Sequence, residues 1–275
     1  MIKIKNLSFS YKEKGSLALK GVDFFMEKTE FVAILGGNGS GKSTLVKVMN
    51  GLLSPYQGEV EVLGCSPADH EQVIKIRKKL GMVFQNPENQ IVCAIVEDDV
   101  AFSLENLGFP REEIKTRVEK ALVMTGLTEK RFAQTADLSG GQMQRLAIAA
   151  ILALHPEMII FDESTSMLDQ QGKEEIFNLI LKLNEEGIGI IYITHFMEEA
   201  VYADRAVLMK NGSIAGSGKP CEIFNKPDLL KSCELDLPEA KELASEFSRR
   251  GVKIDCKEIL TSDQLLEAVE KIRNR

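Results

Sequence analysis

Tryptophan is absent from the 275-residue sequence, and long apolar stretches are absent too. The longest strictly apolar run covers residues 146–154, well short of the roughly 18 residues that a membrane-spanning helix needs. Residues 1–5 alternate apolar with charged side chains and lack the apolar core and small-residue cleavage site of a signal peptide. The sequence therefore predicts a chain that does not span a membrane and that stays in the cytosol.

Neither the cysteines nor the basic residues form a pattern that indicates a binding site. The five cysteines are odd in number and form no C-x-x-C pair, so the sequence predicts reduced thiols and neither a disulfide framework nor a zinc site. The 34 lysines and arginines are outnumbered by 41 aspartates and glutamates, and no dense basic block occurs. Because nucleic-acid binding normally needs a basic stripe, this balance argues against a nucleic-acid partner.

Four short apolar segments, each bounded by polar or turn residues, are typical of strands that are covered on both faces. They are residues 30–35, 80–84, 158–161 and 188–194. Between them, apolar residues recur with helical spacing, as at residues 114–122 and 176–181. This alternation of strands and helices predicts an α/β fold with a mainly parallel sheet.

The C-terminal part of the sequence differs in pattern from the rest. An Asn-Gly pair at 211–212 predicts a hairpin turn that closes a main domain over residues 1–216. Beyond it, residues 238–251 carry apolar side chains on one helical face, and a capping box at residues 261–264 predicts the start of another helix. We therefore expect a small C-terminal appendage over residues 217–275.

A glycine-rich segment, GGNGSGKST at residues 36–44, matches G-x-x-x-x-G-K-[ST] and lies between a predicted strand and a predicted helix. In such a phosphate loop, backbone N–H groups and the positive end of the helix surround phosphate oxygens. Lys42 is expected to reach the β- and γ-phosphates, and Ser43 to bind Mg²⁺. The alternative is a glycine-rich turn that only caps a helix. The predicted nucleotide-binding residues of the loop are Gly36, Gly37, Asn38, Gly39, Ser40, Gly41, Lys42, Ser43 and Thr44.

Two acidic residues, Asp162 and Glu163, follow a buried strand. Neighbouring strand side chains point to opposite faces, so the two acids can have different roles. We expect Asp162 to hold Mg²⁺ through water and Glu163 to act as general base on the attacking water. Alone, such a pair is more often a solvated strand end, but a nearby phosphate loop favours catalysis. His195 also ends a strand, where it either contacts the γ-phosphate or has only a structural role.

A second glycine-rich helix start occurs at residues 138–142, LSGGQ. The simplest interpretation is a helix N-cap at Ser139. A glycine-exposed helix start is, however, also an anion site, so this one chain offers two phosphate-binding helix ends. This arrangement suggests that two chains share one nucleotide.

The phosphate loop, the LSGGQ segment, the Asp-Glu pair and His195 follow one another along the chain as they do in the ATP-binding subunit of ABC transporters, which the sequence resembles. The resemblance adds Gln85 as the Q-loop glutamine, which also joins Mg²⁺, and residues 166–169 as the D-loop. Tyr11 matches the aromatic residue on which the family stacks adenine, although an ordinary strand aromatic is the alternative. The catalytic residues that the resemblance implies are Glu163, His195, Lys42 and Gln85.

The same resemblance implies a fold and a dimer. The fold is a P-loop NTPase with a RecA-like parallel sheet core, an antiparallel β-subdomain, a helical subdomain inserted at about residues 86–137, and a small C-terminal α/β extension. Two subunits pack head to tail, so that each completes the ATP site of the other; the second subunit is an identical chain or a paralogue. The residues supplied across that interface are Ser139, Gly140, Gly141 and Gln142, and Asp169 of the D-loop is a further expected ATP-binding residue.

Segments around the Q-loop, at residues 83–90, 96–102 and 105–108, narrow the resemblance to the ATPases of energy-coupling-factor importers, including the cobalt and nickel type. This group imports vitamins or transition-metal ions. The resemblance implies an integral membrane coupling subunit, a separate substrate-binding membrane subunit and a peripheral position at the cytoplasmic face of the cell membrane. It also implies that the C-terminal extension helps to hold the ATPase dimer together.

Two other functions remain open at this point. A soluble ABC ATPase of DNA repair or translation would have no membrane partner, but such proteins usually carry a long coiled-coil insertion or two fused halves, and this chain has neither. A nucleotide-regulated binding module without turnover is disfavoured by Glu163 and His195. The sequence also departs from the usual family pattern at Gly37, where a bulkier residue is frequent, and at Ser164, where proline is frequent.

Overall fold

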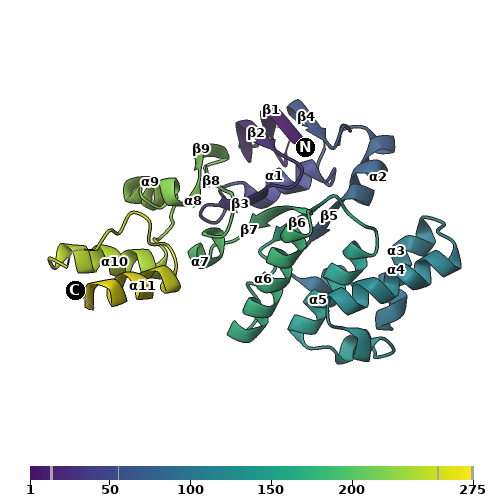
Figure 1. The fold of residues 1–275 in the computed structure, drawn as a ribbon. Coiled ribbons are helices and arrows are strands. Elements are labelled where there is room, and N and C mark those ends of the chain that lie inside the picture. The colour runs from purple at the N-terminus through teal and green to yellow at the C-terminus, as the bar shows by residue number, and fades with distance from the viewer. Residues whose placement is uncertain (13–14, 55, 253, 274–275) are drawn as a thin grey trace.

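The computed structural model describes residues 1–12, 15–54, 56–252 and 254–273. Its centre is a six-stranded sheet in the order β5-β6-β7-β3-β8-β9 (Figure 1). All neighbouring strands are parallel except β9, which returns antiparallel to β8 through the predicted Asn-Gly turn. The strands are β3 (Phe31–Leu35), β5 (Leu80–Val83), β6 (Met158–Asp162), β7 (Gly189–Ile193), β8 (Arg205–Lys210) and β9 (Ser213–Gly218). The predicted α/β fold with a mainly parallel sheet is confirmed.

A three-stranded antiparallel sheet covers one side of this core. Its strands are β1 (Ile2–Phe9), β2 (Leu19–Met26) and β4 (Gln57–Val62), in the order β2-β1-β4. Inward-facing residues such as Ile2 and Leu7 are fully buried and share one apolar cluster with Val32 of β3 and Leu45 of α1 (Lys42–Met49). This cluster fixes the phosphate loop, which joins β3 to α1, between the two sheets.

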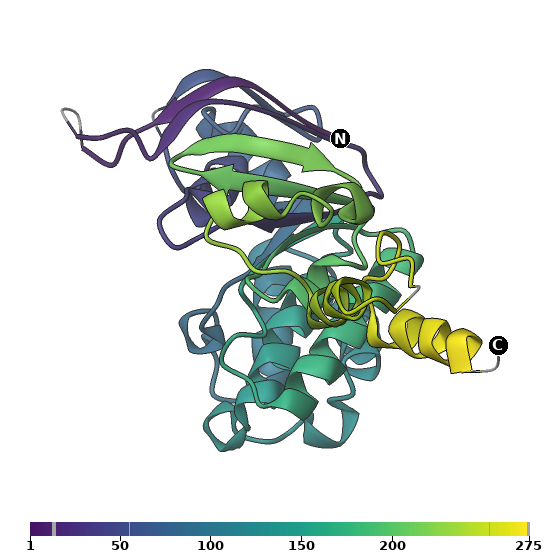
Figure 2. The same ribbon diagram turned by 90° about the vertical axis from the view of Figure 1, so that its left-hand side faces the viewer.

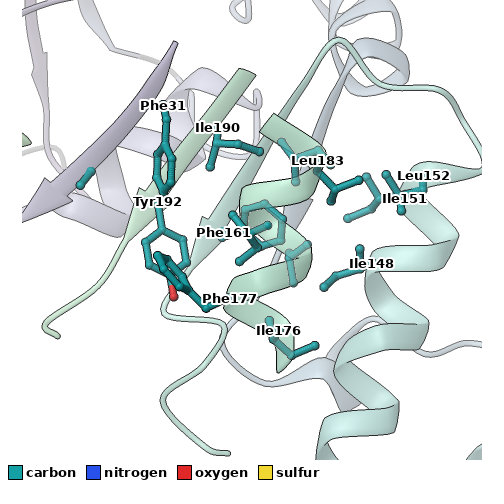
Figure 3. Close-up of a cluster of buried hydrophobic side chains, with 14 of the residues drawn as sticks. Phe31, Ile148, Ile151, Leu152, Phe161, Ile176, Phe177, Leu183, Ile190 and Tyr192 are labelled. Atoms are coloured by element: carbon teal, nitrogen blue, oxygen red, sulfur yellow. The ribbon is translucent and has the colours of Figure 1, made fainter. Parts of the chain in front are cut away.

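Long helices cover the other face of the parallel sheet. The largest are α5 (Gly140–Leu152) and α6 (Gln170–Glu185). Figure 3 shows their apolar side chains packed on the aromatic residues of the sheet. Tyr192 is central to this packing, with its ring centroid 6.1 Å from that of Phe31 and 5.7 Å from that of Phe177. Tight packing on this face holds the carboxyl ends of β6 and β7, where the polar residues lie, in fixed positions.

Residues 86–137 are helical and lie at one end of the molecule, against α5 (Figure 1). Their elements are η1 (Pro87–Asn89), α3 (Val96–Asn106), α4 (Arg111–Met124), η2 (Thr128–Lys130) and η3 (Thr135–Asp137). A further helix, α2 (His70–Lys79), precedes β5, and the short α7 (Met197–Ala200) follows β7. Throughout the described ranges, none of the helices has the length and apolar character needed to cross a bilayer.

The C-terminal extension projects from the opposite end (Figures 1 and 2). Its helices are α8 (Pro220–Ile223), α9 (Pro227–Ser232), α10 (Glu239–Arg249) and α11 (Ser262–Arg273). We expected a C-terminal extension of helices and strands, and the helices are present. The expected strands are not, because residues 219–252 and 254–273 form no strand. The physical reason is that α10 and α11 bury their apolar faces against each other in a small core of their own, around Ala244 and Ile259.

Candidate active site

The phosphate loop lines a cavity of about 810 Å³ at the carboxyl end of β3. Two loop glycines are required by its geometry. Gly36 has φ +150° and a Cβ there would lie 2.3 Å from the Met209 carbonyl oxygen, while Gly41 has φ +108° and a Cβ would lie 2.9 Å from the Ala18 carbonyl oxygen. Only glycine permits this tight path. The loop therefore turns directly into α1, whose first residue is Lys42.

The Lys42 side chain folds back over the loop. Its Nζ donates hydrogen bonds to the carbonyl oxygens of Gly36 at 2.8 Å and Gly37 at 3.1 Å. Burial lowers the pKa of the Lys42 ammonium, while the charges of Glu163 and Asp162 raise it. Carbonyl oxygens are weak partners for an ammonium compared with phosphate oxygens, which carry full charge. The loop thus holds a positive charge at the place where a phosphate group would gain most from it.

Ser43 and Asp162 form a pair of oxygen ligands beside the loop. The Ser43 hydroxyl donates to Asp162 Oδ1 at 2.8 Å, and Asp162 is only 7% exposed. Burial raises the pKa of the Asp162 carboxyl, and the Ser43 hydrogen bond lowers it. A buried carboxylate and a hydroxyl fit a hard divalent cation such as Mg²⁺, which usually takes one or two protein ligands and completes its shell with phosphates and water.

Glu163 lies at the meeting point of three segments. Gln85 Nε2 donates to Glu163 Oε2 at 3.2 Å and to Ser166 Oγ at 3.3 Å, and His195 Nδ1 lies 4.0 Å from Glu163 Oε2. The backbone of Glu163 has φ +52°, a conformation that non-glycine residues rarely adopt. Such strain often occurs at functional residues. The structure thus brings Gln85, Glu163 and His195 together around the phosphate-loop cavity.

Tyr11 lines the same cavity at its outer edge. Its ring is 61% exposed and packs edge-on against Phe9, with 5.0 Å between the ring centroids. Its hydroxyl is 3.1 Å from the Thr44 Oγ1. An exposed aromatic ring at the mouth of a phosphate site is well placed to stack on a nucleotide base.

The LSGGQ residues lie elsewhere. Ser139 caps α5, as predicted, and the structure adds a reciprocal capping box with Gln142. Ser139, Gly140 and Gly141 line a separate hollow of about 300 Å³ together with Asp169, whose carboxylate caps α6 by accepting from the Gly172 N–H at 2.9 Å. The structure therefore does not bring these residues to the phosphate loop of the same chain. One chain therefore carries two separate cavities, one at the phosphate loop and one at the LSGGQ segment.

A buried network behind the cavity escapes the sequence analysis. Glu199, 8% exposed, accepts a 2.5 Å hydrogen bond from Thr194 and a 3.1 Å bond from Thr165, and the Thr165 hydroxyl is 3.1 Å from the Tyr192 hydroxyl. The network joins the strand end before His195 to the segment after Glu163. The available signal was the pair of acidic residues, Glu198 and Glu199, that follows His195 in the sequence.

The Glu199 carboxyl makes a testable contribution to the pH dependence of stability. Burial raises the pKa of Glu199, although its hydroxyl partners lower it. A raised pKa means that this group's contribution to stability is complete below its unfolded pKa and is lost as the pH rises through its folded pKa. Glu199→Gln cannot ionise, so its free energy of unfolding should rise relative to that of the wild type as the pH increases from 4.5 to 7.5.

Urea unfolding at the two pH values checks this prediction. Glu198→Gln, which changes an exposed neighbouring carboxylate, is the matched control and should show no such relative rise. A constant difference between Glu199→Gln and the wild type across the pH range would contradict the role of burial.

A phosphate loop at the end of the parallel strand β3, with an Asp-Glu pair at the end of β6 on the far side of β7, defines the chain as a P-loop ATPase. More narrowly, the chain belongs to the ABC transporter family, whose model matches residues 19–166. The solved structure of cbiO1 from Clostridium perfringens, described as part of the ABC transporter complex cbiONQ, is 37% identical. It superposes with a TM-score of 0.76 and covers 89% of this chain and 98% of that one.

Two full-length relatives are closer in sequence. The energy-coupling factor transporter ATP-binding protein EcfA1 of Clostridium novyi is 49% identical, with 99% of each chain covered. EcfA1 of Caldanaerobacter subterraneus is 47% identical, with 98% of each chain covered. The cassette MJ0796, solved as a dimer bound to ADP and phosphate, is 33% identical, has a TM-score of 0.72 and covers 80% of this chain and 99% of that one. The chain is therefore an ABC-type ATPase.

Proposed function

We propose that this chain is the ATP-hydrolysing subunit of an energy-coupling-factor importer of vitamins or of cobalt or another transition metal. The main support for this proposal is the cavity at the phosphate loop, where Glu163, Gln85 and His195 lie together and Asp162 is hydrogen-bonded to Ser43. The chain is also similar over its full length to EcfA1 proteins. ATP is the substrate, with its triphosphate in the loop and its base on Tyr11.

The residues divide the chemistry between them. Ser43 and Asp162, with Gln85, hold Mg²⁺, which supplies positive charge to the phosphate oxygens. Lys42 exchanges its carbonyl partners for the β- and γ-phosphates, and His195 hydrogen-bonds the γ-phosphate. Glu163 accepts a proton from the attacking water and is kept in place by Gln85. The network through Glu199 fixes the segments that carry Glu163 and His195.

A second ATPase subunit completes each site in this proposal. The separate hollow around Ser139 and Asp169 supports it, because these groups are held ready for a phosphate that their own chain does not bring to them. The extension supports a dimer as well: on α10 and α11, Leu243 is 51% exposed and Leu266 is 59% exposed. Such apolar side chains are typical of an interface. The partner is either an identical chain or a paralogue.

The helical segment at residues 86–137 is the proposed docking face for the integral membrane coupling subunit, which joins the substrate-binding membrane subunit. Phe102 is 38% exposed and Phe132 is 76% exposed on this segment. The ATPase is then peripheral, at the cytoplasmic face of the cell membrane. We propose no nucleic-acid partner, in keeping with the net charge of −7.

Membrane recovery tests this assignment. Co-expressed with the membrane subunits of an energy-coupling-factor importer, the chain should sediment with membranes and co-purify with the coupling subunit. Phe102→Glu should abolish recovery while ATP binding persists, because a charge replaces an apolar contact. Phe25→Glu, at a phenylalanine of β2 that is 45% exposed, is the matched control. Recovery only in the soluble fraction, or with ribosomes or DNA, would instead support a soluble ABC ATPase of translation or DNA repair.

A further inference from the structure

The start of the C-terminal extension lies directly on the phosphate loop. Residues 233–236, which we term the linker, join α9 to the segment before α10. The Gly37 N–H donates a 3.0 Å hydrogen bond to the Cys233 carbonyl oxygen. Glu234, Leu235 and Asp236 line the same cavity as Lys42. The nucleotide site is therefore in contact with the segment of chain that leads from α9 toward α10.

Glu234 occupies a backbone position that suits glycine. It follows the C-cap of α9 with φ +60°, and the Glu234 and Leu235 N–H groups donate to Lys231 and Leu230 carbonyl oxygens in the pattern of a Schellman motif. Glycine is the usual residue at this point because side chains are strained there. Across the described ranges, the Glu234 carboxylate accepts no hydrogen bond and forms no ion pair. The backbone conformation at this position therefore does not favour glutamate, and the contacts of its carboxylate do not stabilise it.

Gly37 complements Glu234. Its φ lies outside the left-handed region, so its backbone conformation does not itself require glycine. A Cβ at Gly37 would instead lie 2.3 Å from Glu234 Oε2 and 3.0 Å from Glu234 Cβ. The bulkier residue that is frequent at this loop position would displace the Glu234 side chain. The departure from the family pattern at Gly37 thus makes room for the Glu234 side chain.

The acidic residues that line the cavity beside Gly37 repel a triphosphate. Of the cavity-lining residues in the part of the chain that the structure describes, Lys42 is the sole lysine or arginine, whereas Glu163, Glu234 and Asp236 are acidic. Glu163 has a role in catalysis, but Glu234 and Asp236 have none in the chemistry above. An anion entering the loop next to Gly37 is repelled by Glu234 until the linker moves. Because the linker leads into α10, that movement displaces the extension.

We propose that Glu234 is a charge gate on the nucleotide site: its carboxylate rests against Gly37, weakens triphosphate binding, and couples nucleotide entry to movement of the linker and the C-terminal extension. The gate rests on MgATP binding at the phosphate loop, as in the proposed function. It does not depend on the membrane partner or on the cargo.

Calorimetric titration of the full chain with MgATP and MgADP tests the gate. Glu234→Gln keeps the shape and removes the charge, so it should tighten MgATP binding about threefold to fivefold. The gain should be smaller for MgADP, which lacks the γ-phosphate, and should shrink at high salt. Asp228→Asn, an exposed carboxylate change in α9 outside the cavity, is the control and should leave both affinities unchanged.

A second variant separates the gate from a structural role. Glu234→Gly relieves the strained backbone and should raise Tm by about 2–4 °C, while tightening MgATP binding as Glu234→Gln does. Gly37→Ala should lower Tm in the wild-type background and not in the Glu234→Gly background, because the collision needs the glutamate side chain.

Hydrogen exchange of the linker amides gives the third readout. MgATP should speed exchange at residues 233–236 in the wild type and change it less in Glu234→Gln. Unchanged MgATP affinity in Glu234→Gln, or an equal and salt-independent gain for both nucleotides, would overturn the gate. Failure of the wild type to bind MgATP would instead contradict the proposed function.

Discussion

Replacing Glu163 with glutamine should reduce ATP hydrolysis by about a hundredfold to ten-thousandfold, the usual contribution of a positioned general base. Glutamine has nearly the same size and can keep the contact with Gln85, which lies 3.2 Å from the Glu163 carboxylate. It cannot accept the proton of the attacking water. MgATP affinity should stay within about twofold of the wild type, because Lys42 and the loop are unchanged. Steady-state phosphate release and calorimetric binding together measure the two effects.

Glu186→Gln is the control for this substitution, since it changes an exposed carboxylate at the C-cap of α6 that does not line the cavity. It should hydrolyse ATP at the wild-type rate. Undiminished turnover in Glu163→Gln would remove Glu163 from its catalytic role. A loss of MgATP binding in that variant would show that the carboxylate shapes the cavity rather than the chemistry.

Replacing Lys42 with alanine should have a comparably large effect through a different step. A hydrogen bond to a charged group contributes about 1.5–3 kcal/mol, so MgATP affinity should fall about tenfold to a hundredfold. Hydrolysis should fall by a further factor of about 10²–10³, because the ammonium also stabilises charge that develops on the phosphates. Lys28→Ala, at a lysine whose partner is Glu157 on the surface, should bind and hydrolyse ATP normally. Equal MgATP affinities of Lys42→Ala and the wild type would contradict this account.

Much of the core was predictable from the sequence because its signals are local. The strands at β3, β5, β6 and β7 are short apolar runs, which is the pattern of strands that are covered on both faces. The phosphate loop is contiguous, and its glycines are dictated by its own backbone path. The Ser139 cap is likewise a four-residue pattern. In these cases local preference and tertiary packing favour the same structure.

Other features depend on contacts between distant segments. The Glu199 network needs residues 165 and 194 to meet, and no periodicity encodes that meeting. The return of the linker to Gly37 joins positions almost two hundred residues apart in sequence. The all-helical extension was missed in part because a short chain segment can bury its apolar residues equally well in a helical pair or beside a strand. These features follow from three-dimensional packing rather than from local pattern.

The sharing of one ATP site between two chains is the central claim, and a mixing experiment tests it most directly. Lys42→Ala disables the phosphate loop, and Ser139→Asp keeps an N-cap on α5 while placing a negative charge where the γ-phosphate of the partner would lie. Each variant alone should be almost inactive. Mixed dimers retain one site built from an intact phosphate loop and an intact LSGGQ segment, so ATP hydrolysis should rise well above the sum of the separate variants. No recovery in verified mixed dimers would contradict the shared site.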